Sequence, residues 1–150
     1  MPLKSLNRKE VKHILKLIRE HWDAEVDLDF AFFLSGKDNL YIINKEIANV
    51  ETGKMRINSI GLYFAEFVDN SIRFSIEGSQ IVGKFAKKNV VEVDFQTARK
   101  WMKGEQIDIS GDFSGFVIIK HGKDFLGCGK FLGDKILNYV PKNRRITASD

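Results

Sequence analysis

The sequence is poor in the residues that crosslink or interrupt a chain, with one cysteine and two prolines among 150 residues. A single cysteine, Cys128, excludes an internal disulfide and any zinc site that needs several cysteines. No apolar run approaches the roughly 20 residues of a membrane-spanning helix. The amino terminus lacks the apolar core of a signal peptide. We therefore expect a cytoplasmic protein with no membrane partner.

Motifs for catalysis are equally scarce, because the sequence contains no Ser-His-Asp pattern, phosphate-binding loop or histidine-rich zinc spacing. Gly127-Cys128-Gly129 lacks the third glycine and the following helix of a dinucleotide fingerprint. Glycines inside a strand usually mark a bend or bulge, which is what we predict here. Cys128 has no base nearby in sequence except His121 at a turn, so we expect a small buried residue and not a nucleophile.

One acidic segment offers potential metal ligands, because its carboxylates would share a strand face if the backbone were extended. The alternative is a solvated, charged edge that deters strand pairing between molecules. The carboxylates are those of Asp23, Glu25, Asp27 and Asp29. We favour the charged edge, and predict no catalytic residue, no metal and no cofactor.

The composition, 43% hydrophobic and 29% charged, is that of an ordinary globular protein. The charge is uneven along the chain. Residues 1–83 carry 11 Lys and Arg against 12 Asp and Glu, whereas residues 84–150 carry 13 against 8, a net charge of +5. This asymmetry fits either a polyanionic partner for the second half or a solvated lysine-rich surface.

Hydrophobic periodicity predicts the elements of the first half. A helix should begin after Asn7, which can form a capping box with Glu10. Strands are expected at 30–34 and 40–43, a short helix at 44–50, and a hairpin turning at Asp69-Asn70. His13 and His21 lie off the apolar stripe of the first helix, so we expect them to face solvent.

A short helix is expected at 79–87, and a composition shift follows at "AKKN", residues 86–89. A strand "VVEVD" and a helix "FQTARKWMKG" follow, with Asp94 near the N-cap and Gly104 at the stop. Three β runs come next, "GFVIIKHG", "DFLGCGKFLG" and "KILNYV". Closely spaced strands with glycine turns suggest a small barrel.

The second half resembles a PUA domain, a small RNA-binding pseudo-barrel, in "NVVEVDFQTARKWMKGEQID" and "GFVIIKHGKDFLGCGKFLGDKILNYVPKNRRI". Its ending is similar to PUA segments of archaeal Sun-family RNA methyltransferases. "LYIINKEIANV" and "SIGLYFAEFVDNSIRFSIEGSQI" resemble the pre-PUA domain of a pre-PUA/PUA ribosome-biogenesis factor. The resemblance implies an α+β fold: an α/β pre-PUA domain at 1–86 packed on a PUA pseudo-barrel at 87–150.

The resemblance also implies that the chain binds RNA, either rRNA or tRNA, and is not an enzyme. The family's surface comprises the PUA helix, the loop after it and the last strand. "DISGDFSG" departs from the Arg-Pro-Gly-Asp-like turn of many PUA domains, which puts loop contacts by 110–114 in doubt. The implied RNA-binding residues, together with nearby cations at the boundary, are Lys87, Lys88, Arg99, Lys100, Lys103, Lys130, Lys142, Arg144 and Arg145.

Two functions are compatible with these patterns. The first is RNA binding in rRNA or tRNA processing or modification, or in ribosome biogenesis, where lysines and arginines contact phosphates. The second is an adaptor that recruits an RNA-modifying or RNA-degrading enzyme, with ribosome-assembly proteins as possible partners. Exposed Phe64, Phe67 or Phe74 on the hairpin would favour the adaptor.

Overall fold

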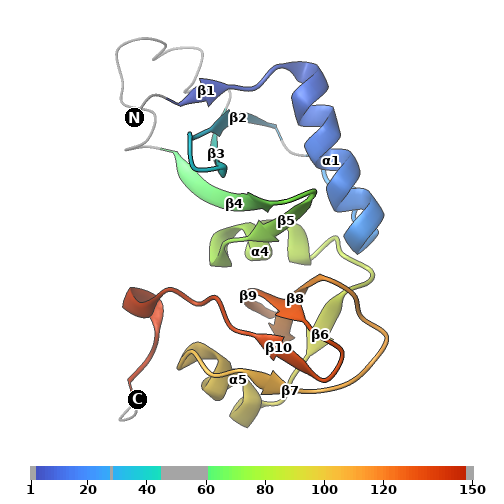
Figure 1. Ribbon diagram of the computed structural model, residues 1–150, viewed down its shortest axis with the longest axis vertical. Coiled ribbons are helices and arrows are strands. Elements are labelled where there is room, and N and C mark those ends of the chain that lie inside the picture. Colours follow the sequence, from blue (N-terminus) through green and yellow to red (C-terminus); the bar gives the residue numbers. More distant parts are fainter. Residues whose placement is uncertain (1–2, 28, 45–60, 148–150) are drawn as a thin grey trace.

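The computed structural model describes residues 3–27, 29–44 and 61–147. Two units lie one above the other, each built on a five-stranded sheet (Figure 1). Three α-helices occur in the described ranges, which confirms the mixed α+β class. None of these three helices is long and apolar enough to cross a membrane.

The first unit is an antiparallel sheet in the order β1-β2-β3-β4-β5. Its strands are β1 (Lys4–Ser5), β2 (Phe30–Leu34), β3 (Asn39–Asn44), β4 (Leu62–Val68) and β5 (Ser71–Phe74). The predicted hairpin is confirmed, because Val68 pairs with Ser71 across the turn at Asp69 and Asn70. Neighbouring strands in the sheet therefore follow one another in the sequence.

Helix α1 (Arg8–Trp22) runs beside this sheet (Figure 1). The predicted capping box is present: the Asn7 side chain accepts the Glu10 N–H at 2.8 Å, and the Glu10 carboxylate accepts the Asn7 N–H at 3.0 Å. The hydrogen bond from Asn7, with a further one from Lys4, lowers the pKa of Glu10. The helix ends at Asp23, which adopts the left-handed conformation. Its fully buried stripe consists of Ile14, Ile18 and Trp22.

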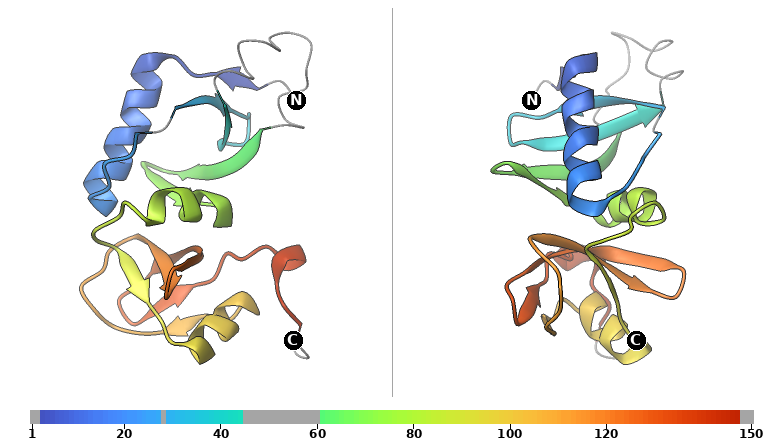
Figure 2. Two further views of the ribbon diagram at one scale, coloured as in Figure 1. Left: turned by 180° about the vertical axis from the view of Figure 1, so that it is seen from behind. Right: turned by 90° about the vertical axis from the view of Figure 1, so that its right-hand side faces the viewer.

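The second unit has the strand order β6-β8-β9-β10-β7. Its strands are β6 (Val90–Glu92), β7 (Ile107–Asp108), β8 (Phe116–His121), β9 (Asp124–Phe131) and β10 (Lys135–Leu137). β6 runs parallel to β8, whereas the other pairs are antiparallel. Helix α5 (Phe95–Met102) connects β6 to β7, which lie at opposite edges of this sheet. Views from two further sides show α5 at the end of the molecule distant from α1 (Figure 2).

The Gly-Cys-Gly segment lies at a bulge in β9, as predicted. Ile119 pairs with Gly127 but Lys120 pairs with Phe125, so Leu126 is an extra residue between the two pairs. Gly127 has φ 132°, a value that side chains rarely permit. Cys128 is buried, and burial raises its pKa to about 12. The thiol therefore stays protonated at neutral pH, which is consistent with a role in packing and not in catalysis.

Both faces of β8 are buried, and they face different cores. Phe116 and Ile118 pack into a cluster that contains the buried stripe of α1 and much of the first sheet. Val117 and Ile119 point the other way, into the interior of the second unit with Trp101. This alternation follows from the two-residue period of a strand. The first core therefore continues across the boundary between the units.

Helix α4 (Ile76–Gly83) lies between the two sheets (Figure 1). The prediction of a helix at 79–87 was wrong in position, because the Ser75 side chain accepts the Gly78 N–H at 2.9 Å and starts the helix earlier. The short helix predicted at 44–50 falls almost entirely outside the described residues. The predicted boundary between 86 and 87 falls in the connection from α4 to β6, and the division into two domains stays a prediction.

Candidate nucleic-acid interface

Helix α5 carries three of the predicted RNA-binding cations. Its N-cap is Asp94, whose carboxylate accepts the Thr97 N–H at 2.8 Å; this hydrogen bond lowers the pKa of Asp94. Lys103 is the C-cap, where a cation is favourable beside the negative end of the helix dipole. Lys100 is exposed, whereas Arg99 is half-buried with its guanidinium 5.8 Å from the centre of the Phe95 ring.

The carboxyl-terminal tail returns to the end of α5. The Ile146 N–H donates to the Met102 carbonyl at 3.0 Å. The Asn138 amide donates to the carbonyls of Trp101 and Glu105, both at 2.8 Å. Asn138 and Ile146, which flank the basic residues, are thus both hydrogen-bonded to the helix or its exit, which fixes where the tail lies.

Arg145 occupies a specific position on this junction. Its Nε donates to the Val140 carbonyl at 3.0 Å, and its side chain lies against Gly104. Gly104 has φ 95°, and a Cβ at this position would overlap the Arg145 side chain. The glycine that was predicted to end the helix therefore also makes room for Arg145. We call the cations at this junction the α5–tail surface: Lys100, Lys142 and Arg145, which are exposed, and Lys103, which is half-buried.

Arg144 points elsewhere, although it is adjacent in sequence. Its guanidinium binds both carboxylate oxygens of Glu77 on α4, at 2.8 and 3.3 Å. The hydrogen bond lowers the pKa of Glu77 and raises the pKa of Arg144. Arg144 therefore links the tail to the other unit through the short 3-10 helix η1 (Lys142–Arg144). Its predicted contact with a phosphate would require this ion pair to open.

The remaining predicted cations lie away from the α5–tail surface. Lys87 and Lys88 are exposed in the connection after α4, where their backbone N–H groups donate to the Trp22 carbonyl at the end of α1. That connection and the tail lie on opposite sides of the molecule (Figure 1). Lys130 on β9 lies 5.8 Å from the centre of the Phe116 ring. The structure thus places the nine predicted residues in separate regions, and brings Arg145 of the tail to the end of α5 beside Lys103.

The seam between the units contains two features that the sequence did not indicate. A cavity of about 140 Å³ is bordered by Arg73, Tyr139 and Arg144. Arg73 lies 4.3 Å from the centre of the Tyr139 ring and binds Glu66 at 2.6 Å. Both arginines in this seam are therefore paired with carboxylates. Arg73 and Glu66 face each other across the β4–β5 hairpin. Tyr139 and Glu77, in contrast, are distant in sequence from the arginines that they contact, so no local signal marks those two contacts.

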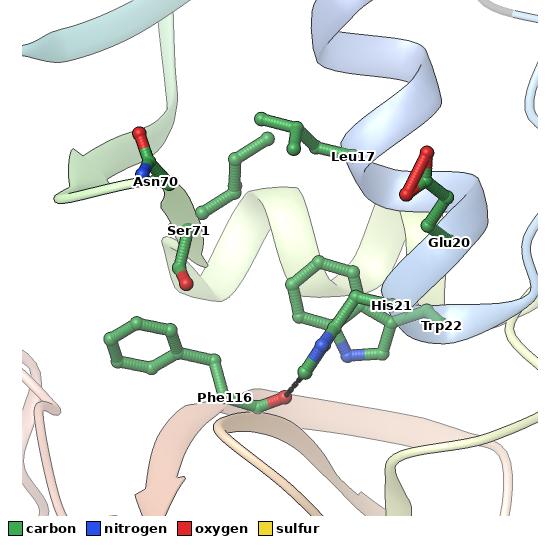
Figure 3. A pocket seen from close by; sticks show the side chains of 8 residues that line it. Leu17, Glu20, His21, Trp22, Asn70, Ser71 and Phe116 are labelled. Carbon is green, nitrogen blue, oxygen red and sulfur yellow. Dashed lines mark hydrogen bonds between the residues drawn. The ribbon is translucent and has the colours of Figure 1, made fainter.

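A second cavity of about 220 Å³ lies where α1 and β5 approach β8 (Figure 3). The His21 Nε2 lies 2.8 Å from the Phe116 carbonyl, so this nitrogen carries the proton and donates. The expectation that His21 faces solvent was therefore wrong, because the second unit covers its end of α1. The buried Trp22 Nε1–H has no hydrogen-bond partner among the described residues.

The hairpin aromatics that would have favoured an adaptor are not available. Phe64 and Phe74 are 0% and 3% exposed in the core, and Phe67 is half-buried. The acidic row at 23–29 lies in the connection between α1 and β2 and not in a strand. Within the described residues, no group of three or more His, Cys, Asp or Glu side chains is placed to hold a metal ion.

The fold of the chain is similar to that of a solved PUA domain protein. "Structure of a Conserved PUA Domain Protein from Thermoplasma acidophilum" aligns with a TM-score of 0.60 and 13% identity, over 92% of this chain and 93% of that one. At this identity the likeness concerns the fold alone. Residues 88–146 match the family described as "Methyltransferase RsmF PUA domain". The second half of the chain is thus similar to a PUA domain of that kind, in agreement with the resemblance noted in its sequence.

Curated relatives extend the similarity to the first unit. "Ribosomal RNA small subunit methyltransferase F" of Vibrio vulnificus is 25% identical over 94% of this chain. The protein of that name from Aeromonas salmonicida is 26% identical over the same share. In both alignments the chain spans 29% of the relative's length. The resemblance to PUA segments of RNA methyltransferases is thus confirmed, while an archaeal character and the pre-PUA assignment of the first unit stay predictions.

Proposed function

We propose that the chain is an RNA-binding module that acts in rRNA modification or processing, with its PUA domain docked on the RNA backbone. The observation that carries this proposal is the attachment of the basic tail to the end of α5, which places Lys103 and Arg145 at one junction. Cations arranged in this way can neutralise neighbouring phosphates without reading sequence. The relatives' name supports rRNA over tRNA as the class of RNA.

The role that we propose is binding and not catalysis. Cys128, the one thiol in the chain, is buried and protonated, so it is a poor nucleophile. The alignment with the methyltransferases covers 29% of their length, which gives no reason to transfer their reaction to these residues. We further propose that the first unit is a pre-PUA domain that supports the PUA sheet through the shared core around β8.

Titration of a labelled rRNA fragment at several salt concentrations tests the proposal. Each neutralised phosphate contributes about −0.7 to −0.9 to the slope of log affinity against log salt. Replacing Lys103 and Arg145 with alanine should weaken binding and flatten the slope by about 1.4 to 1.8 if both contact phosphates. A matched control is the double variant Lys87→Ala/Lys88→Ala, which removes the same charge from the opposite side (Figure 1).

Comparing the two double variants distinguishes a specific contact at the α5–tail surface from an effect of net charge. The proposal expects a larger loss for the α5–tail variant than for the control. Equal losses would mean that net charge alone governs binding, and would count against this surface. An unchanged affinity in the α5–tail variant would refute the proposed site.

A further inference from the structure

A groove of about 610 Å³ lies on another flank of α5, away from the tail. It is bordered by α4, α5 and the β8–β9 hairpin, which projects between the two helices in the right-hand view of Figure 2. Its lining includes Lys84, Phe95, Met102, His121, Lys123 and Phe125. Its volume falls in the range of small-molecule sites, roughly 300–1,000 Å³.

Close packing at the base of the hairpin forms the floor of this groove. The Phe125 ring lies against Gly83 at the end of α4, so closely that a Cβ on the glycine would overlap it. Ala98 and Met102 supply one wall from successive turns of α5. The floor is therefore apolar and held by contacts between three elements.

The rim of the groove is basic, and its cations lack carboxylate partners. Lys84 and Lys123 are exposed, and Lys120 lies 5.6 Å from the centre of the Phe125 ring. None of these three, in the part of the chain that the structure describes, forms an ion pair. Of the described lining residues Asp124 alone is acidic, while Asp94 nearby is engaged as the cap of α5.

The rim also presents an exposed aromatic ring. Phe95 is 62% exposed, which is unusual for a side chain of its size, and its ring lies 6.2 Å from that of His121. The His121 Nδ1–H donates to the Val93 carbonyl at 2.9 Å, which holds the imidazole in place. The guanidinium of Arg99 lies beside the same phenyl ring. A flat ring with cations around it is the arrangement that binds single-stranded nucleic acid, because every base can stack on it.

We propose that this groove takes an unpaired nucleotide of RNA, with the base stacked on Phe95 and the flanking phosphates on Lys84 and Lys123. The inference rests on the proposed function, since it adds a single-strand contact to a protein that binds RNA. The unpaired lysines of the rim favour an RNA strand, which is negatively charged, over an uncharged peptide as the occupant of the groove. In the seam each of the two arginines is paired with a glutamate, whereas no carboxylate in the described ranges pairs with the lysines of this rim.

Fluorescence anisotropy with a labelled oligouridylate and a labelled RNA duplex tests the groove. Phe95→Ala should weaken binding of the single strand by about 5- to 150-fold, the effect of losing one stacked base, and leave the duplex unaffected. Phe95→Trp should retain single-strand binding. Lys84→Ala and Lys123→Ala should each flatten the salt slope for the single strand by about 0.7. Leu132→Ala is the matched control, because it truncates another apolar side chain that is 47% exposed.

Each outcome points to one conclusion. If the wild type binds neither RNA, the proposed function and the groove both fail. If Lys103→Ala/Arg145→Ala weakens RNA binding but Phe95→Ala does not, the groove is refuted and the proposed function stands. If Phe95→Ala instead abolishes a crosslink to a neighbouring protein in ribosomal precursors, with both RNAs bound normally, the groove is a protein-docking site and the inference is wrong.

Discussion

Replacing Glu77 with glutamine should lower the stability of the protein and raise its affinity for RNA. The carboxylate of Glu77 holds Arg144 through two hydrogen bonds at 2.8 and 3.3 Å. The side chains of Arg144 and Glu77 are 44% and 31% exposed, so the pair has the energetics of a surface ion pair, about 0.2–1 kcal/mol. For a chain of this length, 1 kcal/mol corresponds to a change in Tm of about 2–4 °C.

The same substitution releases a cation next to Lys142 and Arg145. If Arg144 then contacts a phosphate, the salt slope should steepen by about 0.7 to 0.9. The assays are thermal denaturation and the RNA titration at several salt concentrations. Glu20→Gln is the matched control, since it removes an equal charge and breaks the exposed Lys16–Glu20 pair, whose atoms are 3.7 Å apart.

The stability effect should also depend on pH with a definite sign. The pKa of Glu77 is lowered chiefly by the hydrogen bond from Arg144. A lowered pKa means that the pair contributes its stability above the ordinary Glu pKa of about 4.3, and loses it as the pH falls through the folded-state pKa. The Tm difference between wild type and Glu77→Gln should therefore disappear in acid. Equal affinities and slopes for Glu77→Gln and Glu20→Gln would refute the reasoning that the pair withholds Arg144 from RNA.

Three further results are expected. Gly104→Ala should destabilise the fold by about 1–2 kcal/mol in urea denaturation, because φ 95° strains a side chain there and Arg145 is displaced; an unchanged midpoint would contradict this. Cys128 should resist a thiol reagent in the folded protein and react on unfolding, since burial raises its pKa to about 12. His21→Ala should cost about 1 kcal/mol or more, because the buried Phe116 carbonyl loses its donor; full stability in the variant would exclude that role.

Local patterns were the predictable part of this fold. The cap at Asn7 and the stripe of α1 follow from residues close in sequence, and so does the bulge at Gly127. The start of α4 was placed too late because the strand-like sequence pattern continues past Ser75. In the structure the Ser75 hydroxyl accepts the Gly78 N–H and begins the helix there. Which aromatic side chains of the hairpin are buried was left open, because the sequence does not show which face of the hairpin is covered; Phe64 and Phe74 prove to be buried.

The candidate sites depended on contacts between distant residues and were predictable only in part. The cations of α5 and the tail were predicted from a resemblance to a known RNA-binding domain, and the structure brings Lys103 and Arg145 to one junction. The pairing of Arg144 with Glu77 joins residues 67 positions apart, so no local signal could reveal it. The groove was missed for the same reason, since Lys84 and Lys123 belong to different elements.

Because β8 is buried on both faces, the two units should be difficult to separate, in evolution or by engineering. The second unit excised by itself would expose Phe116, Ile118 and Cys128 to water, an apolar surface that promotes aggregation. Grafting the second unit onto another protein should therefore require the first unit as well. The pair is the natural unit of transfer, and the relatives' alignment over 94% of this chain, across both halves, accords with that.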